Sequence, residues 1–159
     1  SPSPPPARKD GKPLGSSESK RIYWANALFS EADRAFNEIC ADRLREEGYL
    51  VFLPQETSMT FDKAPTNEEI FKTDTSEILS ADVLVACIDQ FPIDSGVACE
   101  IGVAHASGIP IIGFYTDIRS KREGSGRMYK NQYVMGAIES AGEVVYSIDQ
   151  LLQAIPKYL

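Results

Sequence analysis

The chain has 159 residues, a formal net charge of −7, 43% hydrophobic residues and 25% charged residues. Its length favours a single domain, and its composition is ordinary for a soluble globular protein. The acidic balance argues against a nucleic-acid partner, which would need a basic face, but it leaves open a neutral nucleoside as a ligand.

The first 20 residues are predicted to form a flexible tail. They include five prolines and five serines and almost nothing apolar. Such a segment cannot bury enough surface to offset the entropy that it would lose on ordering. We therefore expect a single folded domain over residues 21–159.

The first half of this domain alternates between strand and helix patterns. We expect a strand over residues 21–26, a helix that starts near Ser30 and stops at Gly48, a strand over 49–54, an irregular loop over 55–65, and a helix capped by Thr66 or Asn67 that runs to Ser80. The predicted apolar faces are Ala32, Phe36, Ile39, Cys40 and Leu44 in the first helix, and Ile70, Phe71, Ile78 and Leu79 in the second. Thr73, Asp74 and Thr75 are poor helix formers, which indicates a break or a special role at that point.

The second half begins with a nearly continuous apolar run. Residues 82–88 have the pattern that is typical of a central parallel strand covered on both faces. A loop over 89–95 follows, and then a helix that carries Glu100. The remaining elements are expected to be a buried strand over 110–115, an exposed and mobile basic loop over 117–127, a helix over 131–140, an edge strand over 143–147 and a final helix over 148–156.

Glu100 is the only formally charged residue between Asp94 and Asp117. A helix that is apolar all round is normally buried, and a buried Glu is destabilising unless it is paired or hydrogen-bonded. Glu100 is therefore either a helix-rim residue that reaches solvent or a functional carboxylate. Ser95 is predicted to be the N-cap of this helix. A break at residues 108–110 divides the uncharged interval into a helix and a strand, each too short to cross a membrane.

The alternation of strands and helices predicts a parallel sheet with helices on both faces. Right-handed crossovers favour an α/β, flavodoxin-like three-layer sandwich with a five-stranded parallel sheet in the order 2-1-3-4-5. Ligands of such sheets bind beyond the carboxyl ends of the strands, near the switch between the first and third strands. The polar residues expected in that region are Tyr23, Asn26, Asp74, Asp89, Asp94 and Glu100.

Several acidic groups at one sheet edge suit two kinds of chemistry. An oxygen-rich cluster could bind Mg²⁺ or Ca²⁺, but the chain lacks a DxDxDG-like loop, and the spacing of Asp94 and Glu100 does not favour a metal site. The alternative is cleavage of a glycosidic bond, in which one carboxylate attacks the anomeric carbon and a second acid protonates the leaving group. Tyr23 is the nearest hydroxyl that could orient Glu100. No Walker A, GxGxxG or HExxH pattern is present.

The three cysteines, Cys40, Cys87 and Cys99, lie in apolar runs without CxxC spacing. This pattern predicts small buried thiols in a reducing, cytoplasmic compartment. The single histidine, His105, leaves little material for a histidine metal cluster or a Ser-His triad, and we interpret it as a structural or surface residue.

One set of residues and spacings resembles that of a known family. The set comprises Ile22-Tyr23 at the end of the first strand, Asp74 before the third strand, the run Asp94-x-Gly96-x-x-x-Glu100-x-Gly102-x-Ala104 with Gly108-x-Pro110 behind it, and Asn131 in Asn-Gln-Tyr-Val-Met-Gly. Over roughly residues 21–147, the chain is similar to the nucleoside 2-deoxyribosyltransferase family.

The resemblance implies an enzyme that transfers 2-deoxyribose between nucleobases with retention of configuration. Glu100 would be the nucleophile that forms a covalent deoxyribosyl-enzyme, and Tyr23 would position it. Asp74 would recognise the base and act as, or support, the general acid. Asp94 would bind the base or a sugar hydroxyl.

The resemblance also implies the partners. The substrates would be a 2′-deoxynucleoside and a free nucleobase, and the mechanism needs no cofactor. Asn131 would reach the 5′-hydroxyl from a neighbouring subunit, so a homo-oligomer is expected. Further candidates for substrate contact are Asn26, Asp89 and Gly96.

Two features depart from the family pattern and keep alternatives open. Members often end in an aromatic residue whose terminal carboxylate helps to bind the base, whereas this chain ends in Tyr158 and Leu159. The basic loop over 117–127 raises the alternative of a 5′-phosphate, as in the related deoxynucleoside monophosphate N-hydrolases, although the segment after Tyr23 lacks their phosphate loop. The alternatives are thus an N-glycosidase of 2′-deoxynucleosides or their 5′-monophosphates, and a non-catalytic, nucleotide-binding TIR-like module.

Overall fold

The computed structural model describes residues 19–57, 62–121 and 130–159. Its elements are β1 (Arg21–Ala25), α1 (Glu31–Glu46), β2 (Leu50–Phe52), α2 (Pro54–Thr57), α3 (Asn67–Ser80), β3 (Val83–Cys87), α4 (Ser95–Ala106), β4 (Ile111–Phe114), η2 (Ile118–Lys121), α5 (Gln132–Ala141), β5 (Gly142–Val145), α6 (Ile148–Ala154) and η4 (Ile155–Tyr158). The strands form one parallel sheet in the order β2-β1-β3-β4-β5. This order confirms the predicted flavodoxin-like α/β fold.

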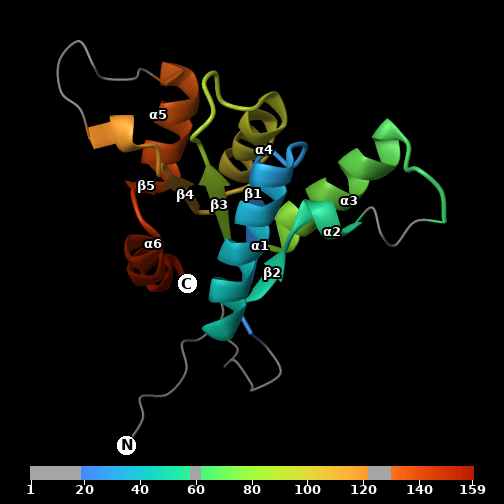
Figure 1. Cartoon of the computed structure of the whole chain (residues 1–159), viewed down its shortest axis with the longest axis horizontal. Helices are drawn as coiled ribbons and strands as arrows, with labels where there is room; N and C mark the ends of the chain where they lie inside the picture. The colour runs from blue at the N-terminus through green and yellow to red at the C-terminus, as the bar shows by residue number, and fades with distance from the viewer. Residues whose placement is uncertain (1–18, 58–61, 122–129) are drawn as a thin grey trace, which may run out of the picture.

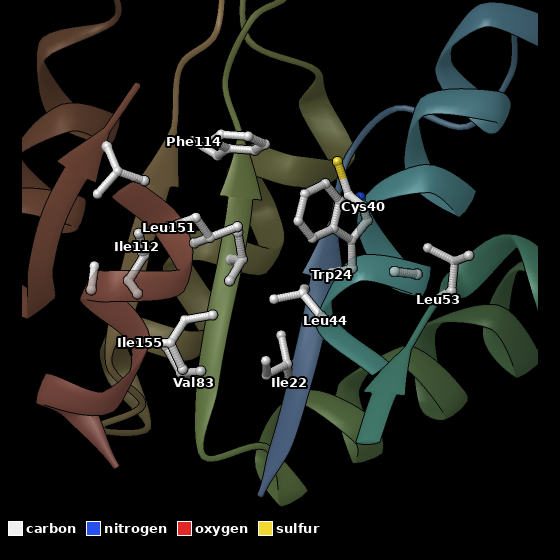
Figure 2. Packing of buried hydrophobic residues seen from close by; sticks show 14 residues of the cluster. Ile22, Trp24, Cys40, Leu44, Leu53, Val83, Ile112, Phe114, Leu151 and Ile155 are labelled. Carbon is white, nitrogen blue, oxygen red and sulfur yellow. The ribbon is translucent and has the colours of Figure 1, made fainter. Parts of the chain in front are cut away.

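Helices cover both faces of the sheet and make three layers (Figure 1). A hydrophobic cluster on each face holds these layers together. On one face Ile22 and Trp24 of β1 pack with α1 and α6, and Figure 2 shows these side chains with Leu151 and Ile155. On the other face Tyr23 and other strand residues pack with α3, α4 and α5. The alternation of side chains along a strand thus sends Tyr23 and Trp24 to opposite layers.

The predicted starts and stops of the helices are largely confirmed. Ser30 caps α1 by accepting a hydrogen bond from Asp33 N, and Thr66 forms a capping box with Glu69 at the start of α3. Gly48 and Gly108, which follow α1 and α4, have φ angles of 92° and 72°. Those angles favour glycine because a Cβ atom is strained in the left-handed region.

Two predictions about local structure are wrong. The segment 55–65 was expected to be an irregular loop, but it begins inside the short helix α2. The N-cap of α4 is Asp94 rather than Ser95, because the Asp94 carboxylate accepts the hydrogen bond from Val97 N and Ser95 is already helical. The pattern did not separate two adjacent residues that both have capping side chains.

The buried face of α1 also differs from the predicted one. Cys40 and Leu44 are buried as expected, and Phe36 packs against the same cluster. Ile39 is exposed, while the polar residue Asn37 is buried in its place. Because hydrophobic periodicity ranks polar residues as solvent-facing, it cannot predict a buried amide whose hydrogen bonds come from other elements.

α3 runs without a break through Asp74, so the poor helix formers in its middle do not interrupt it. Ile78 is its one fully buried side chain among the described residues, whereas Ile70, Phe71 and Leu79 are exposed. Of the three cysteines, Cys40 and Cys87 are buried as predicted, but Cys99 is exposed on α4.

Parts of three predicted segments lie outside the described residues, namely 1–18 of the tail, 58–61 of the loop over 55–65 and 122–129 of the basic loop. Lys20, at the end of the predicted tail, is buried, and its carbonyl oxygen accepts a hydrogen bond from Leu50 N at 2.9 Å. Among the helices that the structure describes, none is both long enough and apolar enough to cross a bilayer.

Candidate active site

A hydrogen bond between β1 and α4 forms the centre of the candidate site. The hydroxyl of Tyr23, a residue with 0% exposure, donates to the Oε2 atom of Glu100. The Tyr23 ring is held by Phe52, whose ring centroid lies 5.3 Å away in a stacked arrangement. Two residues that are 77 positions apart in the chain are therefore joined at the core of the fold.

α4 presents Glu100 at the edge of its buried face. Val97, Ile101 and Ala104 are the buried residues of this helix, and Glu100 lies at helical spacing from the first and the last of them. The Glu100 side chain is half-buried. Glu100 therefore lies at the rim of the buried face, which is one of the two alternatives that the sequence left open.

Burial shifts the protonation of two carboxyl groups in the same direction. The pKa of Glu100 is raised to about 7 by burial, which the hydrogen bond from Tyr23 opposes and the charges of Asp74 and Asp94 reinforce. The pKa of Asp74 is raised to about 6, again by burial first and then by the charge of Glu77. Near neutral pH, one of these two carboxyl groups can therefore be protonated while the other is ionised.

The pKa of the Tyr23 phenol is raised far above its usual value by burial and by the neighbouring charge of Glu100. Its hydroxyl therefore stays protonated and acts as a permanent donor to the carboxylate. This donor favours the ionised form of Glu100, which the buried surroundings disfavour.

A cavity of about 440 Å³ opens beside Glu100, between the end of β1, α2, α3 and α4. Its polar lining includes Asn26, Gln55, Asn67, Asp74, Thr75, Asp94 and Glu100. Its apolar lining includes Leu28, Phe29, Pro54, Pro65, Ile70, Phe71, Ile78 and Val103. This volume and this mixture of an apolar wall with a few polar groups suit a small organic ligand.

The structure brings most of the predicted site residues together. Asn26, Asp74, Asp94, Gly96 and Glu100 line the cavity, and Tyr23 joins them through its bond to Glu100.

Two predicted site residues do not line this cavity. Asp89 accepts hydrogen bonds from the backbone N–H groups of Thr116 and Asp117 and from the Thr116 hydroxyl. Its carboxylate therefore stabilises the loop that follows β4. Asn131 is exposed and caps α5 by accepting a hydrogen bond from Val134 N at 3.1 Å.

Other residues at the cavity were missed by the sequence analysis. Phe29 and Phe71 are 82% and 59% exposed, and both line the cavity. Cys99 and Gln55 also line it. Gln55 lies in a segment whose pattern predicts a loop, and Phe71 belongs to a predicted apolar helix face, so neither carries a local signal for a site.

The C-terminal residues lie on the other side of the sheet. Tyr158 and Leu159 pack against the cluster of α1 and α6, and the Tyr158 hydroxyl donates to Glu143 Oε2 at 2.7 Å. They are thus separated from the cavity within one chain. Among the described residues there is no group of three or more His, Cys, Asp or Glu that could hold a metal ion.

This arrangement can perform a displacement at an electrophilic carbon. A carboxylate held by a permanent donor has the chemistry of a nucleophile, and a second carboxyl group with a raised pKa has that of a proton donor to a leaving group.

Comparisons with known proteins point the same way. Residues 22–145 match the family described as Nucleoside 2-deoxyribosyltransferase. A solved structure of a conserved protein from Enterococcus faecalis V583 is 36% identical, with a TM-score of 0.80 over 89% of this chain and 99% of that chain. No protein of the curated set matches the chain.

Two more distant structures share the fold. A 2-deoxyribosyltransferase from Bacillus psychrosaccharolyticus is 23% identical, with a TM-score of 0.65 over 82% of this chain and 89% of that chain. The CMP N-glycosidase BcmB from Clostridium botulinum is 22% identical, with a TM-score of 0.57 over 88% of this chain and 100% of that chain.

Proposed function

Because the chain belongs to the nucleoside 2-deoxyribosyltransferase family, we propose that it transfers the 2-deoxyribosyl group from a 2′-deoxynucleoside to a second nucleobase. The observation that carries the proposal is the hydrogen bond from Tyr23 to Glu100 beside a cavity that also contains Asp74. A nucleophile and an acid with raised pKa values on the same cavity are the groups that glycosidic cleavage requires.

In the first step, a carboxylate oxygen of Glu100 forms a bond to C1′ of the nucleoside as the bond from C1′ to the base nitrogen breaks. The electron pair of the broken bond stays on the departing base, which takes a proton from Asp74. The hydrogen bond from Tyr23 favours the ionised form of this carboxylate and fixes its direction. The product of this step is a deoxyribosyl ester of Glu100 and a free nucleobase.

In the second step, a nitrogen of another nucleobase attacks C1′ and the ester bond to Glu100 breaks. The electron pair returns to the Glu100 carboxylate, and the incoming base gives up a proton to Asp74. Two displacements at the same carbon retain its configuration. If water attacks instead, the same site acts as an N-glycosidase, so the fate of the intermediate distinguishes the two activities.

The other residues of the proposal contact the substrate or complete its binding site. Asp94, Gly96 and Asn26 line the cavity and are assigned to base or sugar contacts. Asn131, which is exposed at the start of α5, is assigned to the 5′-hydroxyl bound by a neighbouring subunit, so the active protein is a homo-oligomer. We assign no substrate contact to Asp89, because its carboxylate oxygens already accept hydrogen bonds from the loop after β4. No cofactor takes part in either step.

Mass spectrometry of a quenched reaction tests the covalent step. With deoxyinosine as the substrate, we expect a deoxyribosyl adduct on the peptide that contains Glu100, and Glu100→Gln should form none. An adduct on another residue, or turnover without an adduct in either protein, would contradict the assignment of the nucleophile.

Base exchange separates the transferase from the glycosidase. Deoxyinosine incubated with free adenine should give deoxyadenosine, because adenine competes with water for the intermediate. Release of hypoxanthine without deoxyadenosine would assign hydrolysis to this site, and absence of release from any nucleoside or nucleotide would favour a non-catalytic binding module.

A further inference from the structure

Asn37 is a buried amide that the chemistry above does not use. It lies on α1, is 2% exposed, and makes four hydrogen bonds. Its Oδ1 atom accepts from Trp24 Nε1 at 2.9 Å and from Asn26 Nδ2 at 2.8 Å. Its Nδ2 atom donates to Ala27 O at 3.1 Å and to Gln55 Oε1 at 2.9 Å. Every hydrogen-bonding site of this amide is therefore occupied.

Two of these partners have a polarity that cannot change. The indole N–H of Trp24 can only donate, and the backbone carbonyl of Ala27 can only accept. Trp24 points from β1 toward the layer that contains α1 and Cys40 (Figure 2). Because a fixed donor lies on one side of Asn37 and a fixed acceptor on the other, its amide has only one satisfied orientation.

This orientation in turn decides that of Asn26, the first residue after β1. The atom of Asn26 that faces Asn37 Oδ1 must be a donor, so it is Nδ2, and Asn26 Oδ1 is left at the other end of the amide. Turning this amide over would bring two acceptor oxygens together in a buried place. Asn26 is 8% exposed and lines the cavity, and no residue in the described part of the chain hydrogen-bonds to its Oδ1 atom.

We propose that Asn37 is a positioning residue that fixes Asn26 as a hydrogen-bond acceptor in the cavity, and that Asn26 Oδ1 recognises a donor group on the substrate. The inference rests on the proposed function for the identity of the ligand as a nucleoside. The donor is a hydroxyl of the sugar or an N–H of the base, and a nucleoside that lacks it leaves a partly buried oxygen unpaired. Selectivity for that donor is then built into the scaffold by Trp24, which is two hydrogen bonds away from Asn26 and three away from the ligand.

A substrate series crossed with Asn26→Leu tests the acceptor. The series comprises a 2′-deoxynucleoside and its analogues that lack the 3′-hydroxyl, lack the 5′-hydroxyl, or carry a methyl group in place of a base N–H. For the wild-type protein, kcat/KM should fall roughly 10- to 100-fold for the analogue that lacks the donor in contact with Asn26, beyond the losses of the other analogues. In Asn26→Leu this extra loss should disappear, and the analogue that shows it identifies the donor as sugar or base.

A pair of substitutions at Asn37 tests the positioning role. Asn37→Asp keeps an oxygen that can accept the hydrogen bonds from Trp24 and Asn26. It should therefore retain the discrimination between nucleoside and analogue. Asn37→Leu removes the oxygen that holds Asn26, so the discrimination should be lost while Glu100 still forms its covalent adduct. A purely structural role for Asn37 would lower stability in both variants and leave the discrimination unchanged.

If Asn37→Leu does not fold, NMR on the wild-type protein decides the same point. One proton of the Asn26 side-chain amide should exchange slowly with solvent, both in the free protein and with the nucleoside bound. Loss of that protection on binding would mean that the amide turns over, and the inference would fail.

The outcomes for this inference and for the proposed function are distinguishable. Absence of turnover with every nucleoside would overturn the proposed function. In that case, dissociation constants measured by calorimetry for the same series of analogues would test the role of Asn26. Normal turnover with equal discrimination in the wild type and in Asn26→Leu overturns the inference alone.

Discussion

Burial beside the cavity disfavours the ionised form of Glu100, and the hydrogen bond from Tyr23 offsets only part of that effect. In the proposed reaction these surroundings favour attack by the carboxylate, because little solvation must be removed before it attacks. The same burial lowers the stability of the folded protein at any pH at which Glu100 is ionised.

The first prediction concerns stability and pH. In the folded protein the pKa of Glu100 is about 7, compared with a usual value of 4.5. The folded state therefore holds this proton more tightly than the unfolded state, and its contribution to stability is full at acid pH and is lost as the pH rises through about 7. Glu100→Gln cannot ionise, so it should be more stable than the wild type near pH 8, by on the order of 1 to 3 kcal/mol, and this gain should shrink toward pH 4.

Thermal or urea unfolding at several pH values measures this difference. Glu139→Gln, an exposed carboxylate on α5, is the control, and it should change the free energy of unfolding by less than about 0.5 kcal/mol at each pH. A stability difference between Glu100→Gln and the wild type that does not grow with pH would contradict the burial of a charged Glu100.

The second prediction concerns the pH dependence of the reaction. The proposed reaction needs Glu100 without a proton and Asp74 with one, which is the less populated of the two singly protonated forms because Glu100 has the higher pKa. Because the two pKa values are about 7 and about 6, kcat/KM should follow a bell-shaped curve with its maximum between these values. Asp74→Asn should abolish the decline on the alkaline side and lower the rate most for bases that are poor leaving groups. An unchanged alkaline limb in this variant would assign the proton to another group.

At the scale of elements, the parallel sheet depends on a close approach between β5 and β4. A Cβ atom on Gly142, the first residue of β5, would lie 1.8 Å from the carbonyl oxygen of Ile111. On the neighbouring helix α5, a Cβ atom on Gly136 would meet nothing within 4 Å. The two glycines thus look alike in the sequence but differ in their surroundings.

This contrast gives the third prediction. Gly142→Ala should destabilise the protein by roughly 1 to 3 kcal/mol, because β5 must move away from β4 to relieve the overlap. Gly136→Ala should stabilise it by about 0.5 to 1 kcal/mol, because alanine is the better helix former at an open position. Chemical denaturation of both variants measures the two effects, and a similar change in stability for both would contradict the close approach.

The elements themselves also differ in how far local pattern predicts them. The ends of α1 and α4 were predictable, since Gly48 and Gly108 mark the left-handed turns that end helices. The buried face of α1 was not, because Asn37 takes a core position through bonds to Trp24 and Gln55, which belong to two other elements. Periodicity in one helix carries no information about donors and acceptors that the rest of the fold places against it.

At the scale of the whole molecule, the cavity is open on an apolar side. Phe29 and Phe71 line it and are largely exposed in the single chain, whereas Asn131 lies elsewhere, at the start of α5. Exposed apolar groups around a functional cavity are typical of a surface that another subunit covers.

The fourth prediction follows from the assignment of Asn131 to a neighbouring site. Glu100→Gln and Asn131→Ala should each be inactive alone. When the two are mixed and allowed to exchange subunits, a measurable part of the wild-type activity should return, because mixed oligomers contain some sites with both native residues. Mixing of Glu100→Gln with Asp74→Asn is the control, since those residues line one cavity of one chain and should not complement each other. Recovery in the control but not in the test pair would contradict the assignment.

The sequence by itself determined the strands and the main helices, through local patterns such as the apolar runs in β3 and β4 and the capping side chain of Thr66. The alternation of these elements with right-handed crossovers predicted the order of the strands, and one charge in a long uncharged interval drew attention to Glu100. Only the tertiary structure decided which polar residues share a cavity. Tyr23 meets Glu100 across 77 residues, Asp89 turns to Thr116 instead of the cavity, and Asn37 fixes Asn26. Such contacts depend on how layers pack around the sheet, and a local pattern does not encode the partner that a side chain will meet from another layer.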